Sequence, residues 1–282
     1  MSIDVEDWFQ VENMRRAVPV DTWKLRRLRA EQTMDRMLAL MAERDVKATC
    51  FFLGSFAERA PALVGRVADA GHEIASHGYG HRLLGELTPA EFRADVERSK
   101  ALLEDITGLP VRGYRAPCFS ITDWAIRILQ DCGFAYDSSL CATTIPGTRY
   151  GMLADLQPRG GGLIASDGFT EVSLPCLMVG AHALPWAGGG YFRLLPYRVF
   201  RAGVTRILAA GTPYVFYIHP WELDPGQPRV TGLSRSERMR HYLNLERTED
   251  RWSQLLLDFR WTTIAQLLGA AEGENAGGGR CA

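Results

Sequence analysis

Residues 46–54 read Val-Lys-Ala-Thr-Cys-Phe-Phe-Leu-Gly, a largely apolar run that stops at a glycine. A short apolar run that is bounded by a turn signal predicts a buried strand. Residues 60–70 follow a helical pattern that Gly71 ends, and residues 72–76 predict a second short strand. This order of strand, helix and strand indicates two parallel strands that are joined by a crossover helix.

The same alternation continues on both sides of this unit. Ser2 to Val5 predicts a first strand, and Asp21 to Asp45 predicts a helix with apolar residues near helical spacing. The remaining predicted elements are, in chain order, a helix at 88–107, a strand at 111–116, a helix at 122–131, strands at 134–136 and 171–174, a helix at 196–210, a strand at 214–218, helices from 234 and at 248–259, and a strand at 261–264 that leads into a short helix. Repeated strand–helix units predict a parallel sheet with helices outside, either as a barrel or as an open sheet.

One of these helices has particularly clear ends. Thr88 is a suitable N-cap, Pro89 suits the first helical position and Glu91 suits the third. Gly108, which is followed closely by Pro110, predicts that the helix ends at about Thr107.

The composition is that of an ordinary globular protein, with 46% hydrophobic and 23% charged residues among 282. The net charge of −1 provides no positive field, so we do not expect nucleic-acid binding as the main role. No apolar stretch approaches the ~18–20 residues of a membrane span, and no signal peptide is visible. Six cysteines without a Cys-x-x-Cys pair fit a reducing compartment, so we expect a cytoplasmic protein.

The sequence predicts a single domain over residues 1–268, because neither a linker nor an internal repeat divides it. We expect the last part of this domain, from residue 230, to be a helical extension. Residues 269–282 are small, polar and rich in glycine, which predicts a disordered tail. Nothing in the sequence sets an oligomeric state.

Two histidines four residues apart, His77 and His81, follow the predicted strand at 72–76. Side chains at positions i and i+4 share a face on one turn of helix, so both imidazoles can bind one metal ion. Three carboxylates, those of Asp4, Glu6 and Asp7, stand at the end of the first predicted strand. A further carboxylate or nitrogen ligand would complete such a site.

Other polar residues stand at equivalent places along the chain. Arg115 follows Gly113-Tyr114, and His219 closes the apolar run at 214–218. In parallel α/β architectures the ligands bind at the carboxyl ends of the strands, so these side chains can share one site with the His pair. The pattern indicates a metal-dependent hydrolase.

The motifs together resemble a known family, the polysaccharide deacetylases of carbohydrate esterase family 4, which contain the NodB-type domain. The chain is most similar to the branch found in bacterial exopolysaccharide clusters that are associated with exosortase sorting systems. The matching stretches extend from about residue 2 to residue 265, and they are Ser-Ile-Asp-Val-Glu-Asp-Trp-Phe at 2–9, Ser-His-Gly-Tyr-Gly-His at 76–81, Tyr-Arg-Ala-Pro-Cys-Phe-Ser at 114–120, Tyr-Asp-Ser-Ser-Leu at 136–140, Gly-Gly-Gly-Tyr-Phe-Arg-Leu-Leu-Pro at 188–196, His-Pro-Trp-Glu-Leu-Asp-Pro-Gly-Gln-Pro-Arg at 219–229 and Arg-Met-Arg-His-Tyr-Leu-Asn-Leu at 238–245.

This resemblance implies a fold and an activity. The fold is a distorted (β/α) barrel with about seven parallel strands, a variant of the eight-stranded parallel barrel. The activity is removal of N-acetyl groups from the amino sugars of a bacterial exopolysaccharide, so that an N-acetylated glycan would be the partner. The implied cofactor is a divalent metal, with Zn²⁺ as the first choice and Co²⁺, Ni²⁺ or Mn²⁺ as alternatives.

The resemblance also implies roles for individual residues. His77 and His81 would be metal ligands, His219 the general acid, and Arg115 the residue that orients the base. The first motif departs from the family pattern, which has two adjacent aspartates as base and then ligand.

Here Asp4 and Asp7 flank Val5 and Glu6. Strand alternation puts Asp4 and Glu6 on the same face, while Asp7 begins the turn. We favour Asp4 as the base and Asp7 as the metal ligand, and Glu6 stays open as a substitute for either.

Candidate substrate contacts complete the set. Flat aromatic rings suit pyranose faces, and the backbone N–H of Tyr114 or of a neighbour is a candidate donor to the oxyanion. For Asp137, a structural role is as compatible with the sequence as a substrate contact. The candidates for substrate binding are Tyr114, Pro117, Asp137, Trp186, Tyr191 and Trp221.

Two other functions are compatible with the same residues. An allantoinase-like enzyme would keep the fold and hydrolyse a small cyclic amide. A catalytically inactive barrel would bind carbohydrate as an assembly subunit. The retention of three acids, two histidines and a distant third histidine favours an active hydrolase over the inactive barrel.

Overall fold

A computed structural model describes residues 1–141, 143, 153, 162–166 and 168–277 of the chain. Its main element is an eight-stranded sheet in the order β10-β1-β2-β3-β4-β5-β7-β6. The strands of this sheet are β1 (Ser2–Val5), β2 (Thr49–Phe52), β3 (Glu73–Ser76), β4 (Gly113–Tyr114), β5 (Tyr136–Asp137), β6 (Gly162–Ser166), β7 (Phe169–Ser173) and β10 (Tyr217–Ile218). A separate antiparallel pair is formed by β8 (Cys176–Val179) and β9 (His182–Pro185).

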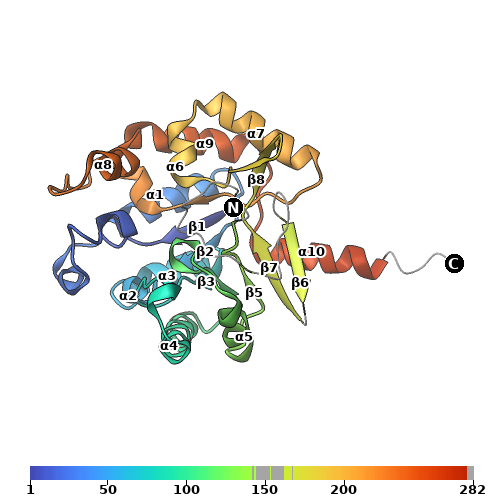
Figure 1. Cartoon of the computed structure of the whole chain (residues 1–282), viewed down its shortest axis with the longest axis horizontal. Coiled ribbons are helices and arrows are strands. Elements are labelled where there is room, and N and C mark those ends of the chain that lie inside the picture. Colours follow the sequence, from blue (N-terminus) through green and yellow to red (C-terminus); the bar gives the residue numbers. More distant parts are fainter. Residues whose placement is uncertain (142, 144–152, 154–161, 167, 278–282) are drawn as a thin grey trace.

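The sheet is parallel from β10 through β1 to β5 and β7, and β6 is antiparallel to β7. Helices surround this sheet (Figure 1), as expected for crossover connections between parallel strands. The predicted fold class, a distorted (β/α) barrel with about seven parallel strands, is therefore confirmed.

The helices and single turns that connect the strands have bounds close to several of the predicted ones. The α-helices are α1 (Ala30–Ala42), α2 (Gly54–Ala57), α3 (Pro61–Asp69), α4 (Pro89–Thr107), α5 (Asp123–Asp131), α6 (Gly189–Leu194), α7 (Tyr197–Ala209), α8 (Arg235–Tyr242), α9 (Thr248–Asp258) and α10 (Ile264–Gly277). The 3₁₀ turns are η1 (Glu12–Met14), η2 (Val20–Leu25), η3 (Leu84–Glu86), η4 (Pro117–Phe119), η5 (Pro220–Leu223) and η6 (Leu245–Arg247). None of the helices within the described part of the chain is long and apolar enough to cross a membrane.

Side chains on β1 alternate between two buried environments. Ile3 and Val5 belong to the larger hydrophobic cluster, which also contains buried residues of α1, α3 and α4. Ser2 and Asp4 point to the opposite face, where both contact the side chain of Arg115. The period of two in a strand thus separates a packed outer layer from a polar site on the inner face.

The register of the sheet aligns the carboxyl ends of its strands. Val5 pairs with Phe52, Phe52 with Ser76, and Ser76 with Tyr114. Tyr114 in turn pairs with Asp137. The residues that directly follow these strand ends therefore emerge at one edge of the sheet, as parallel architectures require.

The ends of α4 lie where the sequence predicts them. Thr88 and Glu91 form a reciprocal capping box, Pro89 is the first helical residue, and the helix ends at Thr107. Gly108 has a φ of +67°, a left-handed conformation that a residue without Cβ adopts at little cost.

Two predicted elements near the start and the end of the chain were wrong. The helix expected from Asp21 begins at Ala30, because its N-terminus is capped by a distant side chain, that of Asp7. The strand expected at 261–264 is irregular up to α10, whose first N–H groups donate to side chains of β2 and β3. Local patterns do not report such long-range caps.

The C-terminal part differs in two further respects. Residues 269–277, which we expected to begin a disordered tail, continue α10, and residues 278–282 lie outside the described residues. Strands β6, β8 and β9 were not predicted from the sequence, because their short apolar runs lie between glycine-rich stretches.

The capping box of α4 gives a direct test of the fold. We expect Thr88→Ala to lower the free energy of unfolding by about 1 kcal/mol, because the N–H of Glu91 loses its acceptor. Urea unfolding followed by circular dichroism measures this change. Thr205→Ala on α7 is the matched control; Thr205 is exposed and bonds only to a carbonyl of its own helix, so we expect a change within about 0.5 kcal/mol. Equal losses in the two variants would contradict the capping role.

Candidate active site

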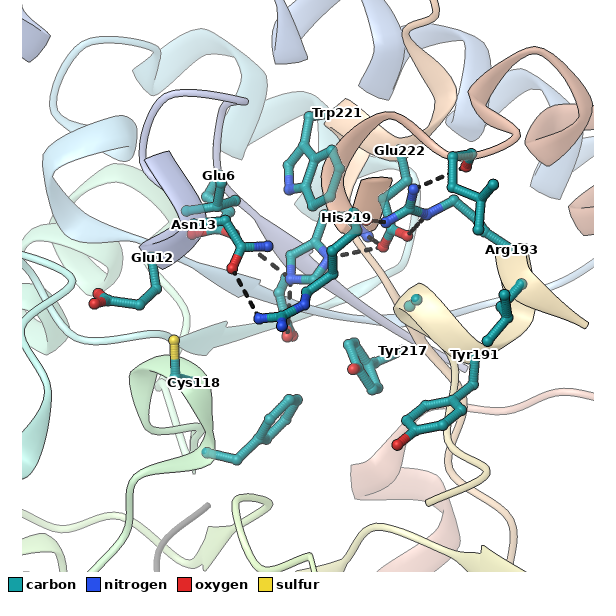
Figure 2. A pocket seen from close by; sticks show the side chains of 18 of the residues that line it. Glu6, Glu12, Asn13, Cys118, Tyr191, Arg193, Tyr217, His219, Trp221 and Glu222 are labelled. Carbon is teal, nitrogen blue, oxygen red and sulfur yellow. Dashed lines mark hydrogen bonds and ion pairs between the residues drawn. The ribbon is translucent and has the colours of Figure 1, made fainter. Parts of the chain in front are cut away.

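A cleft of about 520 Å³ lies at the aligned strand ends (Figure 2). Glu6 follows β1 and His77 follows β3, and both line it. His219 follows Ile218, which pairs with Ile3, and this places His219 beside Asp4. The structure therefore brings the N-terminal acids together with histidines from the middle and the end of the chain.

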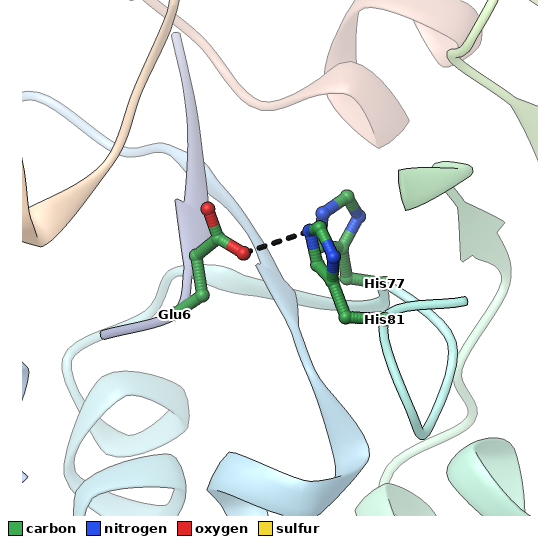
Figure 3. Close-up of side chains that lie close together, drawn as sticks. All are labelled: Glu6, His77 and His81. Carbon is green, nitrogen blue, oxygen red and sulfur yellow. Dashed lines mark ion pairs between the residues drawn. The ribbon is translucent and has the colours of Figure 1, made fainter. Parts of the chain in front are cut away.

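Glu6, His77 and His81 form a compact cluster of donor atoms (Figure 3). One donor atom from each of these buried residues lies within 4.8 Å of the other two. The Oε2 atom of Glu6 is 2.9 Å from Nε2 of His81, and it has no hydrogen-bond donor among the described residues unless that nitrogen carries a hydrogen. Two lone-pair atoms at this distance need a proton or a cation between them, so the cluster fits a divalent metal.

The ring of His77 is held in the form that binds metal. Its Nδ1 atom is 2.9 Å from the carbonyl oxygen of Arg115, which can only accept, so Nδ1 carries the hydrogen and Nε2 keeps its lone pair. Burial lowers the pKa of His77 to about 4, although neighbouring acids act in the opposite direction. A neutral imidazole whose second nitrogen donates to a backbone carbonyl is typical of a metal ligand.

The spacing of the two histidines predicts that they share one turn of helix, and this prediction is wrong. Their side chains converge from an irregular loop. His81 has a φ of +52° and Gly78 a φ of +71° in the irregular segment after β3. The carboxylate of Asp95 on α4 accepts the N–H groups of Tyr79 and Gly80 at 2.7 and 3.1 Å. A Cβ atom at Gly78 would lie 2.9 Å from Asp95 Oδ2, so this position requires glycine.

Asp7 lies outside the cluster, which corrects our preference for it as the metal ligand. Its Oδ2 atom accepts the N–H groups of Arg29 and Ala30 at 2.5 and 2.9 Å, and its Oδ1 atom accepts that of Trp8 at 2.8 Å. The carboxylate thus caps the N-terminus of α1, where a negative charge is favoured. Glu6, the alternative in our sequence analysis, occupies the place of the ligand.

Asp4 is held by a buried arginine. Its Oδ1 atom is 2.6 Å from Nη1 of Arg115, which also donates to the hydroxyl of Ser2. The guanidinium of Arg115 is fully buried and lies over the ring of Phe51. Oδ2, the second oxygen of Asp4, is 3.9 Å from Nε2 of His219 and is thereby directed to the cleft.

His219 is held by an acid that the sequence analysis did not single out, Glu222. The Nδ1 atom of His219 is 2.7 Å from Oε1 of Glu222, and its Nε2 atom is 3.5 Å from Oε1 of Glu6. Burial lowers the pKa of His219, but Glu222, Glu6 and Asp4 outweigh this effect and raise it to about 9. The imidazole is therefore protonated at neutral pH.

Arg193 connects Glu222 to the C-terminal end of α8. Its Nε atom donates to Glu222 Oε2 at 2.6 Å, and its Nη atoms donate to the carbonyls of Arg240, His241 and Leu243 at 2.9 Å. Burial favours the neutral acid, yet Arg193 and His219 lower the pKa of Glu222 to about 2. The quoted motifs contain both residues, but no local pattern indicates that they meet.

The six predicted substrate contacts divide into two groups. Tyr191 and Trp221 line the cleft as expected. The other four lie outside its lining and correct our expectation, and they are Tyr114, Pro117, Asp137 and Trp186.

Three of these side chains have partners elsewhere, and Pro117 is buried in η4. Tyr114 packs against Phe92 and Phe134, and Trp186 stacks on Phe200. The N–H groups of Arg115 and Ala116, neighbours of the expected oxyanion donor, already donate to Ser76 and Ser139. Asp137 belongs to a buried acid pair that is described below.

Other residues line the cleft without a signal in the sequence. They come from η1, η4, β10 and α8, and they include Glu12, Asn13, Cys118, Phe119, Tyr217 and Arg240. Short 3₁₀ turns and a polar helix carry no pattern that distinguishes a cleft wall from an ordinary surface.

Comparisons with known proteins agree with the motifs. Residues 21–136 match the polysaccharide deacetylase family, and residues 143–269 match a domain of unknown function, DUF3473. The chain is 32% identical to a peptidoglycan deacetylase of Helicobacter pylori, over 39% of this chain and 38% of that protein. It is 33% identical to a peptidoglycan-N-acetylglucosamine deacetylase of Bacillus cereus, over 40% of this chain and 48% of that protein. These alignments thus span less than half of each relative.

The fold has a close counterpart among solved structures. A putative polysaccharide deacetylase from Mycobacterium smegmatis superimposes with a TM-score of 0.63 at 20% identity, over 97% of this chain and 91% of that one. This likeness concerns the fold. The family match shows, as predicted, that the chain carries a polysaccharide deacetylase domain over residues 21–136, while the exosortase-associated branch stays a prediction. His77, His81 and Arg115 fall within the matched residues 21–136, and His219 and Glu222 fall within 143–269.

The two neighbouring acids Glu6 and Asp7 provide a matched pair of variants. We expect Glu6→Gln to lose bound divalent metal, because an amide oxygen carries no charge to complete the cluster. Asp7→Asn should retain the metal and unfold at lower urea concentration, because it weakens the cap of α1 by about 1 kcal/mol. Elemental analysis of the purified proteins and urea unfolding measure the two effects. Metal loss in Asp7→Asn at full folding would restore Asp7 as the ligand.

Proposed function

We propose that this protein is a metal-dependent hydrolase that removes N-acetyl groups from amino-sugar residues of a bacterial exopolysaccharide. The observation that carries the proposal is the cluster of Glu6, His77 and His81 with Asp4 and His219 at its edge. The family of the chain supports a glycan as the substrate class.

The donor set suggests which metal the cluster would hold. Two imidazole nitrogens and one carboxylate oxygen, with room in a cleft, suit a catalytic Zn²⁺ site, and Co²⁺, Ni²⁺ or Mn²⁺ have compatible chemistry. A bound divalent ion would polarise the acetyl carbonyl and lower the pKa of bound water toward ~7.

Asp4 is the candidate general base. Arg115 fixes one oxygen of its carboxylate, and the other oxygen is directed to the cleft. A base that is held in this way can accept a proton from the attacking water without reorienting. Positioned proton transfer of this kind contributes typically ~10²–10⁴-fold to the rate.

His219 is the candidate general acid. Its Nδ1–H is held by Glu222, so Nε2 presents the second proton to the same side of the cleft as Asp4. A protonated imidazole there can donate to the departing sugar amine, which is a poor leaving group as an anion. Trp221 lies against the His219 ring, with ring centroids 5.4 Å apart, and limits its rotation.

The size and lining of the cleft are compatible with a saccharide. Its volume of about 520 Å³ lies within the range of ligand pockets, roughly 300–1,000 Å³. Tyr191 and Tyr217 present half-buried rings to it, and amphipathic aromatic rings suit the faces of pyranoses.

One experiment separates this proposal from the two alternatives. Acetate release from N-acetylhexosamine oligomers, with metal analysis of the same sample, supports the deacetylase. Turnover of a small cyclic amide without acetate release would favour the allantoinase-like function. Bound carbohydrate with neither reaction, in metal-loaded protein, would favour the inactive barrel.

The roles of the histidines predict different losses. We expect His77→Ala to abolish both metal binding and acetate release, because the cluster loses one of its ligands. His219→Gln should retain the metal and reduce kcat by ~10²–10⁴-fold, because the leaving amine has no proton donor. Elemental analysis and an acetate assay measure both variants. Full turnover in His219→Gln would remove its assigned role.

Loss of the Glu222 carboxylate should lower kcat less than loss of His219 itself. We expect Glu222→Gln to keep the metal and to lower kcat by ~10–100-fold, because the neutral amide holds and polarises the ring of His219 less well. The matched control is Glu43→Gln, at an exposed glutamate beside Arg44, which should leave kcat unchanged. A normal kcat in Glu222→Gln would show that His219 acts without this support.

A further inference from the structure

Two buried acids, Asp137 and Glu171, lie outside the lining of the cleft and have no role in the proposed mechanism. Asp137 on β5 and Glu171 on β7 are direct register partners, and they are 0% and 1% exposed. One backbone N–H, that of Ser139, lies 3.2 Å from an oxygen of each acid, so the two carboxyl groups lie close together. Two ionised carboxylates this close together and out of water repel each other strongly, so we expect the pair to share one proton.

The surrounding donors indicate which acid carries it. Burial raises the pKa of Asp137, but the hydroxyl of Ser139, which donates to it at 2.6 Å, and the guanidinium of Arg115 act in the opposite direction. The Oε1 atom of Glu171 accepts the N–H of Leu140, but no donor reaches its Oε2 atom among the described residues. Burial, and then Asp137, raise the pKa of Glu171 well above its usual range. Glu171 is therefore the protonated partner and donates to Asp137.

The charged and titratable groups around the pair come from neighbouring strands. Arg115 follows β4 and is the cation that faces Asp137, and the hydroxyl of Tyr114 on β4 is a further titratable group near it. On β5 the neighbour of Asp137 is Tyr136, a titratable group whose hydroxyl donates to Glu73, and on β7 Glu171 is flanked by Thr170 and Val172. The acid pair thus carries one negative charge, which faces one arginine.

The acid pair contacts the turn at residues 138–139, and this turn contacts Arg115. The N–H of Ser139 lies 3.2 Å from an oxygen of each acid, and its hydroxyl accepts the N–H of Ala116 at 2.7 Å. The preceding residue, Ser138, accepts Nε and Nη2 of Arg115 through its carbonyl and hydroxyl oxygens, at 2.9 and 3.0 Å. Arg115 and the peptide that follows it are therefore both anchored to one turn.

We propose that the proton-sharing pair of Asp137 and Glu171 is a positioning device that fixes Arg115 and, through Arg115, the general base Asp4. The inference rests on the proposed function, because Asp4 matters only if it acts on the substrate. The sequence of contacts runs from Glu171 to Asp137, from there to the turn at 138–139, and from this turn to Arg115. Glu171 and Asp137 lie outside the lining of the cleft, so neither touches the substrate.

Two isosteric substitutions at Glu171 test the device. Glu171→Gln keeps a donor toward Asp137 and an acceptor toward Leu140, so we expect kcat to stay within about threefold of wild type. Glu171→Leu keeps the volume and removes both functions, so we expect kcat to fall by ~10–100-fold. In both variants KM and bound metal should be unchanged, because the cleft walls and the cluster stay in place. Equal losses for Gln and Leu, or full activity of Leu, would overturn the proposal.

A double-mutant cycle separates positioning from a general loss of stability. If the pair acts through Arg115, adding Glu171→Leu to Arg115→Ala should lower kcat no further, because the Arg115 side chain that would hold Asp4 is already absent. If the two substitutions instead damage the structure independently, the fold-loss of kcat in the double variant is the product of those in the single variants. That result would contradict the proposal. If Glu171→Leu does not fold, Ser139→Ala replaces it in the cycle, because it removes the link between Asp137 and Ala116.

A readout without substrate distinguishes failure of this inference from failure of the proposed function. Infrared difference spectra of wild type against Glu171→Gln at neutral pH should contain the carbonyl stretch of a protonated carboxyl group. Its absence would refute the shared proton whether or not acetate is released. If the band is present and wild type releases no acetate, the proposed function fails, and with it the role of the pair in catalysis.

Discussion

The structure depends most on one buried interaction, the ion pair between Arg115 and Asp4. Both side chains are almost fully removed from water, which costs several kcal/mol per ion unless each polar atom finds a partner. Arg115 meets this requirement through Ser2, Asp4 and Ser138, which belong to three separate segments of the chain. Its backbone carbonyl also orients His77. One residue therefore links the proposed base Asp4, the proposed metal ligand His77 and the turn at residues 138–139.

The site is assembled from both parts of the chain that match known families. The polysaccharide deacetylase match, residues 21–136, contributes His77, His81 and Arg115, while residues 143–269 contribute His219 with its partner Glu222. Asp4 and Glu6 lie before either match. His219 of the second segment lies 3.9 Å from Asp4 and 3.5 Å from Glu6, so described residues of this segment line the same cleft as those of the first.

Buried carboxylic acids have very different environments here, and their partners explain why. Glu6 faces imidazole nitrogens and belongs to the metal cluster, while Asp7, the next residue, meets three backbone N–H groups and caps α1. Arg193 and His219 lower the pKa of Glu222 against the effect of burial, whereas burial and the neighbouring Asp137 raise the pKa of Glu171. In each case burial sets the cost of a charge, and the neighbouring groups decide whether that charge is kept.

The sequence by itself determined the parallel α/β class, the helix of residues 89–107 with both its caps, and the strand ends at which Glu6, His77, Arg115 and His219 stand. These features follow from local patterns, namely periodicity, cap residues and the rule that parallel strands present their carboxyl ends together. Only the tertiary structure shows that Glu6, and not Asp7, lies in the cluster with His77 and His81. It also shows that Tyr114 and Trp186 pack in the core and that Arg193 contacts Glu222. The physical reason is that these choices depend on donors from distant segments, whose approach no local pattern encodes.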